Sequence, residues 1–187
     1  MGVNMHNQRG SRLQGFTLVE LVIVIVILGL LAATALSRFL DVTDEAEAAA
    51  VEGVGGGFAT AVAIAHARWI ADKHSPGTPN IQINLEGSNI NMNENGWPAN
   101  TDTVGAGLND QNEQECQQVW NSLLQSPPST SVAAADRGKA RYHVTVVNAN
   151  PDVCRYELAS VPAANPPSHR IEYNVGTGQV ITTVPDL

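Results

Sequence analysis

One acidic side chain stands inside a long apolar run near the N-terminus. The run from Phe16 to Leu36 reads FTLVELVIVIVILGLLAATAL, and Glu20 carries its one charge. A carboxylate in a bilayer costs on the order of 3 kcal/mol, so such a group is rare without a partner. A cut between Gly15 and Phe16 would create an amine one helical turn from Glu20. That amine could pair with Glu20 of its own chain or of a neighbouring copy.

The apolar run has the length of a membrane-spanning helix. Its 21 residues, at about 1.5 Å each, reach roughly the 30 Å of a bilayer's hydrocarbon core. β-Branched residues dominate positions 22–27, but a lone strand cannot satisfy its backbone in lipid. Arg9 and Arg12 precede the run, and acids such as Asp41 and Asp44 follow it. The positive-inside rule therefore predicts a cytoplasmic N-terminus with the bulk of the chain outside.

Two simpler interpretations of this segment compete with an assembly helix. A secretory signal peptide also has a basic start and an apolar run, but this run is too long and no small-x-small site follows it. A plain membrane anchor accounts for every feature of the segment except Glu20.

The residues around the expected cut resemble a known processing signal. Gly15–Glu20 reads GFTLVE, which matches the GFTLxE motif of type IV prepilins, the class III-signal precursors. In that family a membrane-embedded prepilin peptidase cuts after the glycine and methylates the new N-terminal phenylalanine. The glutamate five residues into the mature chain guides subunit docking. The resemblance assigns these roles to Gly15, Phe16 and Glu20.

A longer stretch is similar to one branch of the family. Residues 21–69 resemble pilins of the mannose-sensitive haemagglutinin (MSHA) type, especially its minor pilin, in LVIVIVILGLLAATAL, RFLDVTDEAE, VEGVGGGFATAVA and ARW. The resemblance extends to residues 95–98 and 116–124. Many members carry proline where this chain has Ser37, whereas their helix-loosening glycine is present as Gly29. The extent of helix melting between Gly29 and Ser37 in a filament therefore stays open.

The helical pattern continues beyond the apolar run. Apolar residues recur at gaps of three or four, which predicts one packed face: Ala46, Ala50, Val54, Phe58, Val62, Ala65 and Trp69. Glycines at Gly53 and 55–57 interrupt good helix formers. Each glycine lowers the stability of a helix by about 1 kcal/mol relative to alanine. We expect close packing there, against the sheet or against neighbouring subunits, with local flexibility as the alternative. Residues 75–77 (SPG) end the helix near residues 71–74.

The remaining residues predict a small α+β head. Alternation at 80–85 and 88–92 predicts a β-hairpin, residues 112–124 form a helix, and four strands cover 141–147, 153–158, 169–175 and 179–184. Together these elements predict the type IV pilin fold, a long N-terminal helix packed on an antiparallel sheet of about four strands. The expected divisions are a leader at 1–15, a transmembrane and assembly helix at 16–37, an amphipathic helix at 38–74 and the head at 75–187.

The two cysteines, Cys116 and Cys154, are expected to form a disulfide if the head is exported. No CxxC motif is present, so a redox or zinc site is unsupported. An oxidising compartment favours the disulfide. The alternative is two unpaired buried thiols.

Two other constellations of residues were weighed as sites. Asn91, Asn93 and Asn95-Gly96, with Asp102, follow the spacing of a calcium loop, but Asn stands first and Asp rather than Glu stands last. Whether this loop binds calcium stays open, and no other metal and no cofactor is expected. A hydrolase triad can be assembled from His143, Asp136 and Ser160, but no nucleophile-elbow motif supports it. We expect no enzyme activity, and His66 reads as a surface or packing residue.

The resemblance implies a structural filament subunit, major or minor, that acts in surface adhesion and biofilm initiation. It implies other pilin subunits, the prepilin peptidase, a cytoplasmic ATPase, a membrane platform and surface glycans as partners. The chain would lie in the inner membrane before assembly and in an extracellular pilus afterwards. A net charge of −8 gives no reason to expect nucleic acid. The alternatives are a pseudopilin of a type II secretion system and a membrane-anchored sugar-binding module that never polymerises.

Overall fold

The computed structural model of the chain describes residues 15–78, 81–101, 107–160 and 169–184, with the backbone alone at 36–41 and 43. The chain divides into two compact units, Met1–Asp44 and Glu45–Leu187, and each is described by itself. Residues 1–14 of the expected leader lie outside the described residues, as do Asn80 and Asp102.

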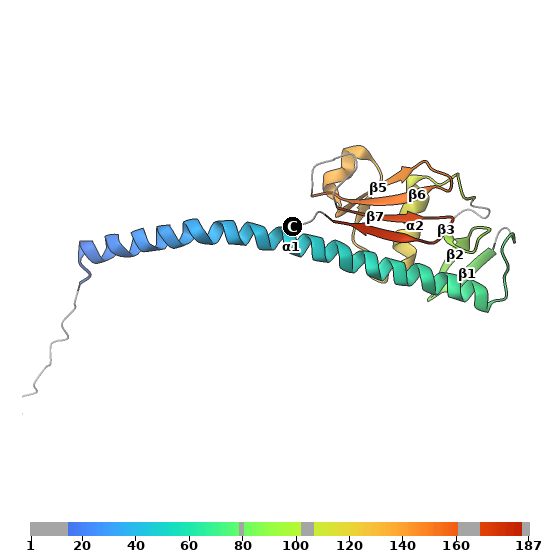
Figure 1. Cartoon of the computed structure of the whole chain (residues 1–187), viewed down its shortest axis with the longest axis horizontal. Coiled ribbons are helices and arrows are strands. Elements are labelled where there is room, and N and C mark those ends of the chain that lie inside the picture. The colour runs from blue at the N-terminus through green and yellow to red at the C-terminus, as the bar shows by residue number, and fades with distance from the viewer. Residues whose placement is uncertain (1–14, 79–80, 102–106, 161–168, 185–187) are drawn as a thin grey trace, which may run out of the picture. The chain divides into compact units, whose positions relative to one another are not determined.

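One helix, α1, runs from Leu18 to Ala71 over 54 residues (Figure 1). In the first unit its segment Leu18–Ala35 has a mean hydropathy of 2.8, and none of it is buried among the residues that the structure describes. Length and composition therefore allow this segment to cross a membrane. The helix ends at Ala71, within the range expected from the sequence Ser-Pro-Gly at residues 75–77. Lys73, just after it, has a left-handed backbone conformation with φ 63°.

In the second unit α1 packs through one face onto the head. The buried positions repeat with a spacing of three and four residues: Ala48, Val51, Gly55, Phe58, Val62, Ala65 and Trp69. The predicted stripe is thus confirmed from Phe58 to Trp69 but wrong for Ala46 and Ala50, which are exposed. Steps of four residues from position 46 drift around the helix, and small alanines and glycines give no signal of the side that packs.

A five-stranded sheet forms the larger β-layer of the head. Its strands are β4 (Thr130–Ser131), β5 (Tyr142–Val147), β6 (Val153–Leu158), β7 (Arg170–Asn174) and β8 (Val180–Thr183), in the order β4-β5-β6-β7-β8. Strands β5 to β8 pair antiparallel, which confirms the four predicted strands. The two-residue β4 pairs parallel with β5, and it is too short to leave a period in the sequence.

A second, three-stranded sheet holds the predicted hairpin. Strands β1 (Ile81–Leu85) and β2 (Ser88–Met92) pair antiparallel, and β3 (Pro98–Asn100) pairs with β2 across a register shift. The hairpin turns at Glu86 and Gly87, which both have positive φ, 49° and 92°. The strand β3 was not predicted, because it starts with a proline, which is uncommon inside a sheet.

Helix α2 (Glu113–Leu123) begins with a capping box, in which the Asn112 side chain accepts from the backbone of Glu115 and the Glu115 side chain accepts from that of Asn112. Its buried face carries the four residues expected from the sequence, Cys116, Val119, Trp120 and Leu123. The ring of Phe58 on α1 lies 5.2 Å from that of Trp120 and 5.5 Å from that of Tyr156 on β6, centroid to centroid. The core thus lies where α1, α2 and the inner face of the large sheet meet.

Candidate processing and assembly site

The expected cut lies just before the regular part of α1. Gly15 and Phe16 are not helical, and Phe16 is 85% exposed. A Cβ added to Gly15 would meet no atom within 4 Å. Within the described part of the chain, the peptide bond between these residues is therefore free of steric cover.

Thr17 and Glu20 form a reciprocal cap at the start of α1. The backbone N–H of Thr17 donates to Glu20 Oε2 at 2.9 Å, and the backbone N–H of Glu20 donates to Thr17 Oγ1 at 3.2 Å. The Thr17 hydroxyl also donates to Glu20 Oε2 at 2.8 Å. A Thr side chain at the N-cap and a Glu three residues on define the capping box.

The capping box corrects one step of the sequence reasoning. We had expected a new α-amino group as the partner of Glu20, but Thr17 supplies two donors without any cut. The spacing T-x-x-E is the sequence signal of such a capping box. Glu20 Oε1 makes no hydrogen bond to the residues described, so the carboxylate keeps one oxygen for a further partner.

In the first unit the apolar side chains of the helix are exposed, as far as the described residues show. Leu18, Val19 and Leu21 are 77%, 64% and 60% exposed, and Leu30 and Leu31 are 67% and 60% exposed. Removing apolar surface from water is favourable by about 25 cal/mol per Å². Lipid or other apolar helices must therefore cover it.

The head is closed by the disulfide expected from the sequence. Cys116 on α2 and Cys154 on β6 are bonded, with their Cα atoms 5.5 Å apart, and both residues are fully buried. The hydroxyl of Tyr156 donates to the Cys116 carbonyl at 2.7 Å, and burial raises the pKa of this tyrosine. These bonds fix α2 on the sheet.

The asparagine loop uses its side chains within the protein. Asn91 Oδ1 accepts from Gln82 at 2.9 Å, and Asn93 Oδ1 accepts from the backbone of Asn95 and Trp97 at 3.0 Å each. The twelfth position, Asp102, lies outside the described residues. Among the residues described, no three His, Cys, Asp or Glu side chains are grouped as metal ligands.

His143, Asp136 and Ser160, which were considered as a hydrolase triad, have separate partners. His143 Nδ1 lies 3.1 Å from the carbonyl of Ser131. Ser160 donates to Glu47 at 3.1 Å, and Asp136 pairs with Lys139 at 2.6 Å. Three different partners engage these residues, as expected for strand and surface side chains.

Comparison with known proteins finds a family match in the N-terminal segment and two similar type IV pilins. The family described as the prokaryotic N-terminal methylation motif matches residues 5–36. The type IV narrow pilus major component PilA5 of Thermus thermophilus is 48% identical over 68 residues, 36% of this chain and 53% of that protein. The type IV major pilin PilE1 of Neisseria gonorrhoeae is 27% identical over 170 residues, 83% of this chain and 94% of that protein. The chain is homologous to type IV pilins.

The two relatives align with different shares of this chain. The alignment spans about half of the Thermus protein, whereas the gonococcal pilin aligns over most of both chains at lower identity. No solved structure matches. The long apolar helix, the second helix and the antiparallel sheet form an α+β layout consistent with the type IV pilin fold.

Proposed function

We propose that the chain is the precursor of a structural subunit of a type IV pilus. The observation that carries the proposal is the methylation motif, matched over residues 5–36, at an exposed Gly15–Phe16 bond directly before a capped apolar helix. The prepilin peptidase would cut this bond and methylate Phe16. Residues 1–15 would then be the leader, 16–37 the assembly helix, 38–74 the helix entering the head, and 75–187 the rest of the head.

In the proposed pathway the mature chain waits in the inner membrane with its N-terminus at the cytoplasmic side. The exposed apolar face of α1 is covered by lipid there and by the helices of other subunits in the filament. The free oxygen of Glu20 accepts from the new amine of a neighbouring or the same subunit. A cytoplasmic ATPase and a membrane platform would drive this transfer.

The finer role that we propose is surface adhesion and biofilm initiation, as an MSHA-like major or minor pilin. The similarity of residues 21–69 to that branch supports it. A type II secretion pseudopilin would share the N-terminal machinery. The buried Cys116–Cys154 disulfide favours a pilin over a pseudopilin, since pseudopilins often lack a disulfide in this part of the chain.

The role of Glu20 is tested by separating its charge from its cap. Glutamine also serves at the third position of a capping box, so Glu20→Gln keeps the hydrogen bond from Thr17 and removes the charge. Glu20→Ala removes both. We expect each variant to be cut and inserted in the membrane but to yield at least about tenfold fewer filaments, as for the loss of an interaction of about 1.4 kcal/mol. Sheared filaments and processed precursor are quantified by immunoblot.

Thr17→Val is the matched control, because it removes the hydroxyl of the cap and leaves the carboxylate. We expect it to retain more filaments than Glu20→Gln. If Glu20→Gln assembles normally while Glu20→Ala does not, Glu20 acts as a helix cap and the docking role is wrong.

A further inference from the structure

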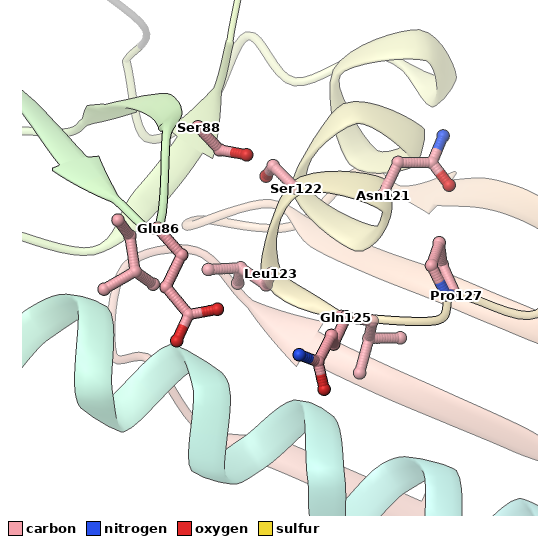
Figure 2. A pocket seen from close by; sticks show the side chains of 9 residues that line it. Glu86, Ser88, Asn121, Ser122, Leu123, Gln125 and Pro127 are labelled. Atoms are coloured by element: carbon pink, nitrogen blue, oxygen red, sulfur yellow. The ribbon is translucent and has the colours of Figure 1, made fainter.

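A hollow at the C-terminal end of α2 has no part in the proposed filament role. It has a volume of about 290 Å³ and lies between the β1–β2 hairpin and the turn that follows α2. Figure 2 shows Glu86 on the hairpin side of the hollow, Gln125 and Pro127 on the side of the turn, and Leu123 between them. The volume is near the lower end of the range for small-molecule sites, roughly 300–1,000 Å³, so a small ligand or a single side chain would fill it.

The last turn of α2 ends beside the hollow with unpaired carbonyl groups. The backbone N–H of Leu124 donates to the Trp120 carbonyl at 3.3 Å. Among the described residues no group donates to the carbonyls of Asn121, Ser122 and Leu123, and all three residues line the hollow. The aligned peptide dipoles give such a helix end roughly half a negative elementary charge. The last turn of α2 contains no basic residue, so the helix itself supplies no cation to balance this charge.

Glu86 adds a full negative charge to the same hollow. Its side chain is exposed and makes no ion pair or hydrogen bond with any residue that the structure describes. Among the described residues that line the hollow, Glu86 is the one with a formal charge. Its φ of 49° belongs to the left-handed region, which hairpin turns of this kind fill with Asn, Asp or Gly. The hollow thus combines a carboxylate with the negative end of a helix dipole, and both attract a cation.

Neutral oxygen atoms and apolar side chains make up the rest of the lining. The Ser122 hydroxyl donates to the Val119 carbonyl at 3.1 Å, which leaves its oxygen to accept from a ligand. The hydroxyl of Ser88 lies in the same lining, and Leu85 and Pro127 contribute apolar surface. An ammonium group has three donors and no acceptor, and a methylene chain attached to it would cover the apolar surface.

Other classes of ligand fit these features less well. An anion would find no basic side chain in the lining and would be repelled by Glu86. A bare metal ion needs several oxygen ligands close together, whereas no three His, Cys, Asp or Glu side chains are grouped in the part of the chain that the structure describes. A cation with an aliphatic chain uses the charge, the oxygen acceptors and the apolar surface together.

From these features we propose that the hollow binds an aliphatic ammonium group. The ammonium would lie between the Glu86 carboxylate and the end of α2, with its carbon chain against Leu85 and Pro127. Two sources carry this chemistry, a free amine and the lysine side chain of a partner protein, and the test distinguishes them. The proposal goes beyond the filament role and concerns the head of the unassembled chain, so failure of assembly would leave it standing.

The test uses the full chain in nanodiscs of phosphatidylcholine, a lipid without net charge, at physiological ionic strength, which screens long-range attraction to the acidic chain. Saturation-transfer NMR is recorded with pentylamine, and with 1-pentanol and pentanoate as neutral and anionic ligands of the same chain length. The signal of empty nanodiscs is subtracted. We expect pentylamine to bind with millimolar affinity and both comparators to bind at least about tenfold more weakly.

Three variants locate the binding. Glu86→Gln keeps the size of the side chain, removes its charge and should weaken pentylamine binding about tenfold, as for the loss of a charge-assisted hydrogen bond. Glu94→Gln is the matched control, because it removes an exposed carboxylate of the same head outside the hollow, and it should leave binding unchanged. Gln125→Lys places an ammonium group of the chain itself at the hollow and should abolish binding.

Cadaverine and Nα-acetyl-lysine methylamide separate the two sources. Tighter binding of cadaverine would assign the site to a free amine, and binding of the lysine derivative at least as tight would assign it to a partner's lysine. No binding of pentylamine, equal binding of pentylamine and pentanoate, or equal effects of Glu86→Gln and Glu94→Gln would each overturn the proposal.

Discussion

At the scale of single residues, Thr17 and Glu20 cap the start of α1 directly after the Gly15–Phe16 bond. Glu20 stands out by its charge alone, and Gly15–Phe16 by the motif. The partner Thr17 was not predicted, because the expectation for Glu20 rested on its burial in lipid and not on its place in the first turn of a helix. His66 was expected to be a surface or packing residue, and the structure stacks it on Trp97 with centroids 3.8 Å apart. That contact joins residues far apart in sequence, which no local pattern reveals.

The glycines of α1 give a prediction at this scale, because only one of them packs closely. A Cβ on Gly55 would collide with Thr182 Oγ1, whereas one on Gly57 would meet nothing within 4 Å. Gly57→Ala should therefore stabilise the head by about 0.5–1 kcal/mol through helix propensity. Gly55→Ala should destabilise it by about 1–2 kcal/mol through overpacking.

Chemical denaturation of the two variants in nanodiscs, followed by tryptophan fluorescence, measures the difference. Pairing Gly55→Ala with Thr182→Ala removes the contacting hydroxyl and should recover most of the lost stability. Equal stability of Gly55→Ala and Gly57→Ala would show that α1 does not approach β8 as described.

At the scale of elements, strands and helices with a clear period were predicted and those without one were not. Strands β5 to β8 alternate strongly, and α2 has a clear buried face ending before Pro127-Pro128. The short β4 and the proline-led β3 could not be predicted, because they exist through pairing with distant strands. The packed face of α1 was predicted only where large side chains, from Phe58 on, mark it.

The outer face of the large sheet gives a prediction for acid stability. Burial raises the pKa of Glu172, but hydrogen bonds and positive charge from Arg170 and Arg155 outweigh burial and hold this pKa below its ordinary value of 4.5. Arg155 lies 2.9 Å and Arg170 3.0 Å from the carboxylate. A lowered folded-state pKa means that the pair stabilises the head above about pH 4.5 and that this contribution is lost as pH falls through the folded-state pKa.

Thermal unfolding of wild type and Glu172→Gln between neutral pH and pH 3 tests whether the ion pairs of Glu172 cause this loss of stability in acid. Glu172→Gln should be less stable at neutral pH and should lose less stability on acidification, so the two curves converge. Parallel curves over the whole range would contradict the assignment of this linkage to Glu172.

At the scale of the whole molecule, the chain combines an apolar helix, whose side chains in the first unit are exposed among the described residues, with a head closed by a disulfide. The first feature was predicted from the length and hydropathy of residues 16–36, and the second from two cysteines in an exported domain. The hollow between the β1–β2 hairpin and the end of α2 was not predicted, because only the folded head brings these segments together.

The central claim is that the chain is cut, methylated and polymerised. Mass spectrometry of filaments sheared from the surface of cells producing the chain tests it most directly. We expect a mature chain that begins with N-methylated Phe16 and contains the Cys116–Cys154 disulfide. Filaments without this chain, or a surface form that still carries residues 1–15, would contradict the account.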